Sequence, residues 1–204
     1  MHKGVTELRE DGICILPDFI PEGQLYELQL HFKAAVEPLS VEADQKLVIP
    51  SRWLDKSAAF QILAKNRVIL EMASDYLGHE PVMAEFSGRR LLPYAPEWPY
   101  GAFQYHHDTV GLQVKAMLLL TDVGSEDQRM TYIAGSHRRL WENYGRYEET
   151  RFSEEAAHRY LRPGEDPIEA IGPAGTMIVF DTNGLHAGRR NRGAVRDTLT
   201  THYR

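Results

Sequence analysis

Apolar residues recur at helical spacing through much of the first 80 residues. The stripe from Leu25 to Val36 follows Pro21, which suits the first position of a helix. A second stripe runs from Val68 to Leu77, and Gly78 has the conformational freedom that the residue after a helix needs. The same part is also predicted to hold a short turn at 6–11 and a small strand at 13–16. We expect this mainly helical part to brace the rest of the chain.

From about Val82 the pattern changes to short apolar or alternating runs separated by Gly, Pro, Asp and Asn, which is typical of a sandwich or barrel. These runs predict strands at 86–92, 101–108, 112–121, 130–134, 174–181 and 196–203. Residues 138–170 interrupt them with many charged and aromatic residues, and Ser153 is placed to cap a helix at 154–162. Such a long insertion in a small β core usually forms a lid or binding loop. We expect a single domain over 1–204, with helical support at 1–80 and a β core at 82–204.

The composition is that of an ordinary globular domain, with 43% hydrophobic and 25% charged residues among 204. A chain of this length can fold without a disulfide or a structural metal, so a metal site would serve function. The net charge of −6 argues against nucleic acid and anionic membranes as partners. The single Cys14 indicates a reducing compartment. The start of the chain has no signal-peptide pattern, and the longest aliphatic run, Ala116–Leu120, cannot span a bilayer, so we expect a cytoplasmic protein.

One His-x-Asp pair, His106 and Asp108, occurs in the chain, and chance alone supplies about one His-x-Asp or His-x-Glu pair in a chain of this composition. Its value lies in geometry, because a strand places residues i and i+2 on one face, about 6.5 to 7 Å apart and within reach of one ion. The same alternation directs His107 away, outward from the site. A third ligand, His186, follows a reversing turn at 182–184. Two imidazoles and one carboxylate form the facial triad of non-heme Fe(II) oxygenases, which leaves positions for a chelating cosubstrate and O₂.

A keto acid that chelates iron needs an anchor for its distant carboxylate, and a planar guanidinium offers two parallel hydrogen bonds to it. Arg196 is the candidate anchor, ten residues after His186 on the last predicted strand. Thr198 lies on the same strand face and would add a hydroxyl. Lys115 shares another predicted strand with Met117 and would add a second cationic contact.

At these residues the chain resembles the phytanoyl-CoA dioxygenase family of Fe(II)- and 2-oxoglutarate-dependent oxygenases. The segments EDGICILPDFI, LLLTDV with the later AGSHR, and GTMIVFDTNGLHAG are similar to family segments in the same order. The resemblance covers most of the chain and implies a mainly β fold, a double-stranded β-helix or jelly roll with helices packed outside. It also implies two sets of site residues, the iron ligands His106, Asp108 and His186 and the 2-oxoglutarate contacts Arg196, Thr198 and Lys115.

Two segments depart from the family pattern. Gln128-Arg129-Met130 stands where Gly-Pro usually precedes the Gly-Ser-His turn, and 88–100 lacks a lysine-proline signal, so part of the cosubstrate pocket has no assigned residue. Among the other histidines, we expect His137 to fix that turn by hydrogen bonds and His158 to be solvated on a helix. His202 could lie next to the site or simply fill the barrel.

For several arginines and aromatic residues, a structural role is possible as well as a functional one. We interpret Arg189, Arg190 and Arg192 as a solvated loop, one of whose arginines could receive an acidic substrate at the barrel mouth. Because strand neighbours alternate, at most one of Arg89 and Arg90 faces inward. Packing, rather than substrate contact, is the expected role of five further residues, Arg52, Trp53, Trp141, Tyr144 and Tyr147.

The leading hypothesis is an oxygenase that uses Fe(II), 2-oxoglutarate and O₂ to hydroxylate an aliphatic carbon of a small molecule, with release of succinate and CO₂. The carboxylate of Asp108 favours hydroxylation over halogenation, while desaturation, ring formation and epimerisation use the same triad. Two alternatives stay open. One is a cupin-like metalloenzyme that uses the same ligands without a keto acid, as an isomerase or dioxygenase. The other is a barrel that binds a small ligand or a partner without catalysis.

Overall fold

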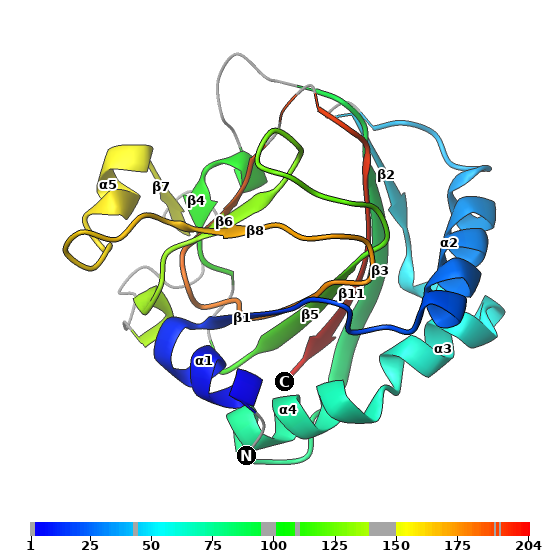
Figure 1. Ribbon diagram of the computed structural model, residues 1–204, viewed down its shortest axis with the longest axis horizontal. Coiled ribbons are helices and arrows are strands. Elements are labelled where there is room, and N and C mark those ends of the chain that lie inside the picture. The colour runs from blue at the N-terminus through cyan, green and yellow to red at the C-terminus, as the bar shows by residue number, and fades with distance from the viewer. Residues whose placement is uncertain are drawn as a thin grey trace.

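The fold consists of two antiparallel β-sheets that face each other, with helices packed mainly outside one of them (Figure 1). This computed structural model describes residues 3–42, 45–94, 101–108, 111–138, 150–189, 191 and 193–204. The six-stranded sheet has the order β1 (Ile13–Leu16), β9 (Met177–Asp181), β5 (Val114–Leu119), β11 (Arg196–Tyr203), β3 (Met83–Leu91) and β2 (Lys46–Ile49). The five-stranded sheet has the order β7 (Arg151–Phe152), β4 (Tyr105–His106), β10 (His186–Gly188), β6 (Met130–Tyr132) and β8 (Ile168–Ala170). This is the predicted jelly roll.

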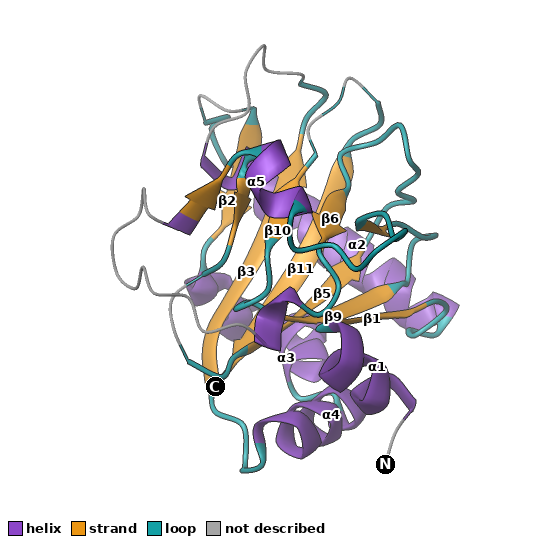
Figure 2. Ribbon diagram, turned by 90° about the vertical axis from the view of Figure 1, so that its left-hand side faces the viewer, coloured by secondary structure: helices purple, strands orange, loops and turns teal. Residues whose placement is uncertain are grey.

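The helices lie mainly against the outer face of the six-stranded sheet, and α1, α3 and α4 gather on one side of the molecule (Figure 2). Their bounds are α1 (Lys3–Asp11), α2 (Glu22–Val36), α3 (Ala58–Ala64), α4 (Arg67–Leu77) and α5 (Glu154–His158). Short 3₁₀ turns are present as η1 (Ser51–Lys56), η2 (Gly101–Phe103) and η3 (Ser136–Arg138). None of the described helices has the length and apolar composition required to cross a bilayer.

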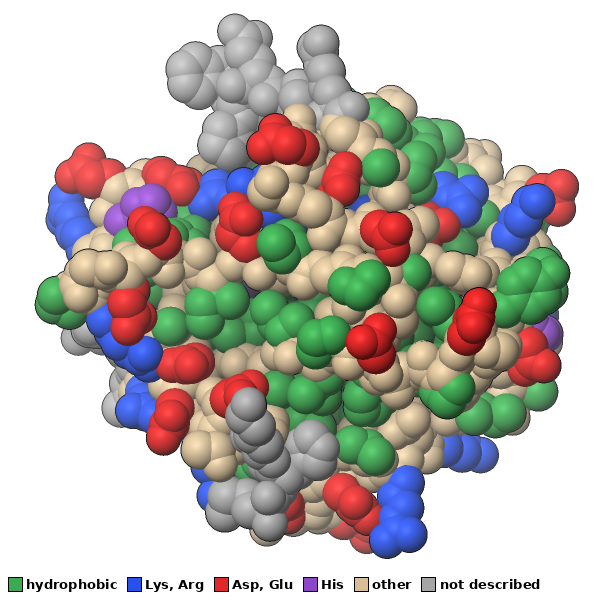
Figure 3. All heavy atoms as spheres, in the orientation of Figure 1, with side chains coloured by type: hydrophobic (Ala, Val, Ile, Leu, Met, Phe, Trp, Pro, Cys, Tyr) green, Lys and Arg blue, Asp and Glu red, His purple; other side chains and the backbone are tan. Residues whose placement is uncertain are grey.

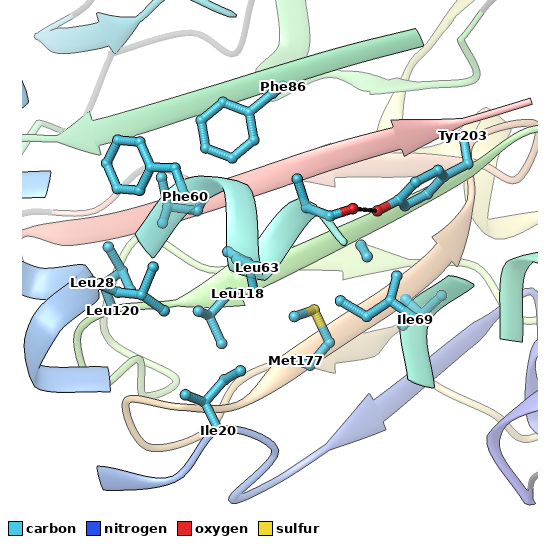
Figure 4. Packing of buried hydrophobic residues seen from close by; sticks show 14 of the residues in the cluster. Ile20, Leu28, Phe60, Leu63, Ile69, Phe86, Leu118, Leu120, Met177 and Tyr203 are labelled. Atoms are coloured by element: carbon cyan, nitrogen blue, oxygen red, sulfur yellow. Dashed lines mark hydrogen bonds between the residues drawn. The ribbon is translucent and has the colours of Figure 1, made fainter. Parts of the chain in front are cut away.

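Strand alternation divides the apolar side chains between two layers. On β5, the side chains of Ala116 and Leu118 pack with the helices, whereas those of Met117 and Leu119 belong to the cluster between the sheets. Figure 4 shows part of the layer under the helices, where the hydroxyl of Tyr203 donates a hydrogen bond to a backbone carbonyl of α3 at 3.0 Å. Because both faces of β5 are covered, its sequence is almost continuously apolar.

Several predicted elements are confirmed. The strands at 13–16 and 196–203 have the predicted bounds. Helix α4 ends as predicted at Gly78, whose φ of 80° is the left-handed conformation that glycine adopts without steric cost. The side chain of Ser153 caps α5 by accepting a hydrogen bond from the N–H of Ala156.

Other predicted elements are wrong in extent. Residues 46–49 form strand β2 inside the part predicted to be mainly helical. The strand predicted at 101–108 is a 3₁₀ turn followed by the two-residue strand β4, and the helix predicted at 154–162 ends at His158. The stretch interpreted as an insertion at 138–170 also contributes β7 and β8 to the five-stranded sheet, so part of it belongs to the barrel wall. Pro21 precedes α2 as its N-cap instead of opening it.

Candidate metal centre

Two backbone segments, β4 with the residues that follow it and β10, bring His106, Asp108 and His186 together between the sheets. Strands β4 and β10 pair with His106 directly opposite His186. Asp108 lies beyond the end of β4, so the assumption that it shares a strand with His106 is wrong. A hydrogen bond from the Asp108 N–H to the carbonyl of Thr182, at 2.8 Å, holds it beside the turn that leads to β10. The ligand atoms of the three side chains lie within 4.8 Å of one another, as a single metal ion requires.

The hydrogen bonds of both imidazoles leave their Nε2 atoms free to face the aspartate. Nδ1 of His106 donates to the carbonyl of Gln104 and Nδ1 of His186 to that of Gly184, each at 2.9 Å. The Nε2 atoms lie 3.8 and 4.0 Å from Oδ1 of Asp108. Burial, with the charge of His186, lowers the pKa of His106 to about 3, and burial also lowers the pKa of His186. Both rings are therefore neutral at pH 7, with lone pairs available to a metal.

The second oxygen of the aspartate is held by a lysine. Nζ of Lys115, on β5, lies 2.5 Å from Oδ2 of Asp108. Burial opposes ionisation of this carboxyl, but the imidazole of His186 and the charge and hydrogen bond of Lys115 outweigh it and hold the pKa of Asp108 well below its usual range. Asp108 is thus a carboxylate at neutral pH, with Oδ1 directed to the histidines. Lys115, predicted to contact the cosubstrate, has the aspartate as its partner here.

The turn before His186 is braced by residues that no pattern in the sequence indicates. Asp181 accepts hydrogen bonds from the hydroxyl of Tyr76 at 2.5 Å and from the N–H of Asn183 at 2.7 Å. The hydroxyl of Tyr132 donates to the carbonyl of Asp181 at 2.9 Å. Gly184 leaves no room for a side chain, because a Cβ at this position would overlap the hydroxyl oxygen of that tyrosine. These contacts fix the course of the chain into β10.

A cavity of about 290 Å³ opens beside the three residues, between the two sheets. Arg196, Lys115 and His202 line it, so His202 lies at the site. Thr198 is on the same strand face but is not among the lining residues, and its hydroxyl lies 3.5 Å from the carbonyl of Arg89. Apolar walls are provided by Leu91, Phe103, Met117, Met130 and Phe180.

The strand that carries Arg89 and Arg90 directs them to opposite sides, as predicted. Arg89 lines the cavity. Arg90 forms two hydrogen bonds with the carboxylate of Asp197, at 2.8 and 2.6 Å, and its guanidinium lies 5.7 Å from the ring centre of Phe32. Arg90 therefore contributes to the packing between sheet and helices.

Of two predictions about polar residues near the site, one is confirmed and one is wrong. His107 is directed away from the metal centre, as predicted, and it is buried, with 1% of its surface exposed, because Phe152 of β7 packs near its ring. Arg189 is no solvated loop residue. Its guanidinium makes two hydrogen bonds to Glu154, at 2.9 and 2.7 Å, and lies 4.6 Å from the ring centre of Tyr105.

Most of the other residues considered in the sequence have packing or hydrogen-bonding roles away from the metal centre. His137 is confirmed as a hydrogen-bonding residue of the turn, with Nε2 3.2 Å from the carbonyl of Arg9, and His158 is partly exposed on α5. Trp53 packs against the helical core, and Arg52 is exposed in η1, outside the cavity lining. Gln128 is fully buried, and its amide donates to two backbone carbonyls at 3.1 Å. Five residues lie outside the described part of the chain, Trp141, Tyr144, Tyr147, Arg190 and Arg192.

Comparison with solved structures finds the same fold in enzymes of low sequence identity. The carbocyclase SnoK of nogalamycin biosynthesis has a TM-score of 0.75 at 18% identity, and the match covers 100% of this chain and 83% of the SnoK chain. The epimerase SnoN, in complex with Fe³⁺, alpha-ketoglutarate and nogalamycin RO, has a TM-score of 0.72 at 20% identity, covering 98% and 82%. HygX from Streptomyces hygroscopicus, with nickel, 2-oxoglutarate and hygromycin B bound, has a TM-score of 0.71 at 17% identity, covering 100% and 86%.

Sequence comparison gives the family. No curated protein matches the chain. The sequence profile of the family described as phytanoyl-CoA dioxygenase (PhyH), however, matches residues 8–197, which is nearly the whole chain and includes all three candidate ligands. The donor set fits the iron that the family uses, because two neutral imidazoles and one carboxylate are the usual ligand set of non-heme Fe(II) oxygenases. The protein therefore belongs to the phytanoyl-CoA dioxygenase family, whose members use Fe(II), 2-oxoglutarate and O₂.

Proposed function

We propose that this protein is an oxygenase that hydroxylates an unactivated C–H bond of a small molecule. The observation that carries the proposal is the convergence of two neutral imidazoles and one carboxylate, within 4.8 Å, on the wall of a cavity that also contains Arg196. Bound Fe(II) and 2-oxoglutarate would supply the oxidising chemistry, in which one oxygen atom of O₂ enters the substrate and the other enters succinate as CO₂ is released. The protein would bind, orient and shield the reactants.

Each residue of the centre has a distinct task. His106 and His186 would donate nitrogen lone pairs from Nε2, since their Nδ1 atoms are committed to backbone carbonyls. Asp108 would donate Oδ1 while Lys115 holds Oδ2, which favours binding through one oxygen. These three protein ligands would leave coordination positions open for the cosubstrate and O₂.

The cosubstrate and substrate would divide the cavity. We assign the distant carboxylate of 2-oxoglutarate to the guanidinium of Arg196, with Thr198 beside it on β11, because this pairing allows two parallel charge-assisted hydrogen bonds. Met117 and Phe180 give the wall near the ligands an apolar surface that suits a carbon skeleton and excludes water. The ring centre of Phe180 lies 5.4 Å from that of His186, so this wall adjoins the metal ligands.

Hydroxylation is the outcome we propose among those open to this centre. The carboxylate of Asp108 occupies the position that a halogenating enzyme of this kind would leave for chloride. The related fold occurs in proteins named as a carbocyclase and an epimerase, so the position of the substrate relative to the metal would decide the product.

Simpler observations support the proposed cellular location and substrate size. A cavity of about 290 Å³ supports a small-molecule substrate. Cys14, the one cysteine in the sequence, is buried and forms no disulfide, which supports a reducing compartment and hence the cytoplasm. Cell fractionation of the native protein tests this location.

Formation of succinate tests the proposed reaction. Protein loaded with Fe(II) is incubated with 2-oxoglutarate in air, and succinate is measured. Asp108→Ala should abolish succinate formation, and Arg196→Ala should raise the 2-oxoglutarate concentration required, whereas Arg52→Ala, an exposed arginine outside the cavity, should change neither. Two results together would contradict the proposal: the iron-loaded wild type forms no succinate, and Arg196→Ala binds 2-oxoglutarate as tightly as the wild type does. They would favour a metalloenzyme that needs no keto acid.

A further inference from the structure

Charge is distributed very unevenly between the surface and the cavity. The sequence carries a net charge of −6, and Figure 3 shows Asp and Glu side chains scattered over one face of the molecule. The cavity has the opposite character, since among the described residues that line it seven are Lys or Arg and two, Glu85 and Asp108, are acidic. The interior between the sheets is therefore a cationic compartment in an acidic protein.

Most of these cations have partners or tasks. Carboxylates outside the lining pair with three of them, Arg129 with Glu169 at 2.6 Å, Arg189 with Glu154 at 2.7 Å and Lys46 with Glu42 at 3.3 Å. Lys115 is engaged with Asp108. Under the proposed function, Arg196 holds the cosubstrate. The metal would bring two positive charges and the cosubstrate two negative charges, so binding both leaves the excess of positive charge in the cavity unchanged.

The two other arginines of the lining, Arg89 and Arg151, lie on opposite walls. Arg89 is on β3 of the six-stranded sheet, and Arg151 is on β7 of the five-stranded sheet. Arg151 is paired across the strands with His106, next to the metal centre, and its guanidinium donates to the hydroxyl of Thr150 at 3.0 Å. Within the part of the chain that the structure describes, the guanidinium of Arg89 has no ion pair or hydrogen bond, and the side chain is exposed at the cavity.

The substrate inferred from these walls is an organic anion. We infer that the cavity takes a small molecule with an apolar carbon body and one anionic oxygen group, a carboxylate or a phosphate, which Arg89 receives. This inference rests on the proposed function and names its substrate class. The planar fork of an arginine matches either group with two charge-assisted hydrogen bonds. The apolar side chains of Met117 and Phe180 beside the ligands would hold the carbon that reacts. The cavity of about 290 Å³ keeps that body short.

Paramagnetic relaxation tests this inference with simple probes of equal chain length. The protein is loaded with Mn(II) and saturated with 2-oxoglutarate, and the relaxation of the methyl protons of hexanoate, hexyl phosphate and hexan-1-ol is measured. At least one of the two anions should relax faster than hexanol, which shows binding near the metal. In Arg89→Gln the affinity for that anion should fall about tenfold or more. Arg89→Lys should retain part of it, and Arg67→Gln, at an exposed position of α4, should match the wild type.

The affinity for 2-oxoglutarate, measured on the same samples, separates the possible failures. It should stay within about twofold in Arg89→Gln, since the arginine is assigned to the substrate and not to the cosubstrate. If 2-oxoglutarate does not bind to the wild type, the proposed function fails. If it binds but neither anion exceeds hexanol, or Arg89→Gln binds the anion as the wild type does, the inference about the substrate is overturned. A loss of 2-oxoglutarate affinity in Arg89→Gln also overturns it, because the arginine then holds the cosubstrate.

Discussion

Replacement of Lys115 by methionine should destabilise the metal-free protein by removing the partner of Asp108. Nζ of the lysine lies 2.5 Å from Oδ2, and the two side chains are 23% and 25% exposed, so the pair is largely withdrawn from water. Hydrogen bonds to charged groups contribute about 1.5 to 3 kcal/mol each. A loss of about 2 kcal/mol corresponds to a fall of about 6 °C in the melting temperature of a protein of this size. Methionine keeps the length and the apolar contacts of the lysine stem, so the change isolates the charge.

The pH dependence of this effect has a definite sign. The pKa of Asp108 in the folded protein lies below that of an unfolded aspartate, which is about 3.9. The carboxylate therefore stabilises the fold fully above that value, and this contribution is lost as the pH falls through the folded pKa. The difference in stability between wild type and Lys115→Met should therefore stay nearly constant from pH 7 to about 4 and shrink as the pH falls below that value.

Calorimetric melting of the protein in EDTA measures both effects. Lys33→Met, at an exposed position of α2, serves as the control and should melt like the wild type. Adding a divalent metal should reduce the deficit of Lys115→Met, because the ion would place positive charge beside the same carboxylate. If Lys115→Met melts at pH 7 within about 1 °C of both wild type and control, the lysine does not stabilise the fold through Asp108.

Three further predictions concern other parts of the molecule. Burial raises the pKa of Asp181 to about 6, above its value in the unfolded chain. Ionisation of this group should therefore lower the unfolding free energy by on the order of 2 to 3 kcal/mol as the pH rises from 4 to 7. In urea unfolding, the unfolding free energy of Asp181→Asn should depend less on pH than that of the wild type. Arg196→Ala should weaken 2-oxoglutarate binding about a hundredfold in anaerobic calorimetry, and an unchanged dissociation constant would remove the arginine from the cosubstrate site. Gly184→Ala places a Cβ against the hydroxyl of Tyr132 and should cost about 1 to 3 kcal/mol in thermal unfolding, whereas Gly23→Ala, with open space at its Cβ in α2, should not destabilise.

The long, regularly patterned elements could be predicted from the sequence. Strand β11 alternates over 196–203 between residues that face the cavity and residues that face the helices, and this period is distinct from that of a helix. Strand β2, with the sequence KLVI, is too short to show a period and lies among helices. Strands β4 and β10 have two and three residues, and only pairing with their neighbours makes them strands.

The candidate ligands were predictable because their chemistry is local in sequence, while their support is not. His106 and Asp108 are two residues apart, and an imidazole after a reversing turn completes the set. The hydrogen bond between Tyr76 and Asp181 joins residues that are 105 positions apart, and no periodicity in the sequence indicates it. Arg189 also depends on distant partners. A run of arginines suggests a solvated loop. Arg189 is instead half-buried, because its guanidinium binds Glu154 and lies over the ring of Tyr105.

Anaerobic titration of the metal-free protein with Fe(II) and then 2-oxoglutarate tests whether His106, Asp108 and His186 hold iron and its cosubstrate. Chelation of a keto acid to iron produces a weak visible charge-transfer band, and its growth reports both binding events in one experiment. We expect a saturable band in the wild type and in Arg52→Ala, and no band in His186→Ala. A folded wild type that binds iron without forming the band, or a band that persists in His186→Ala, would contradict the assignment of this centre to iron and 2-oxoglutarate.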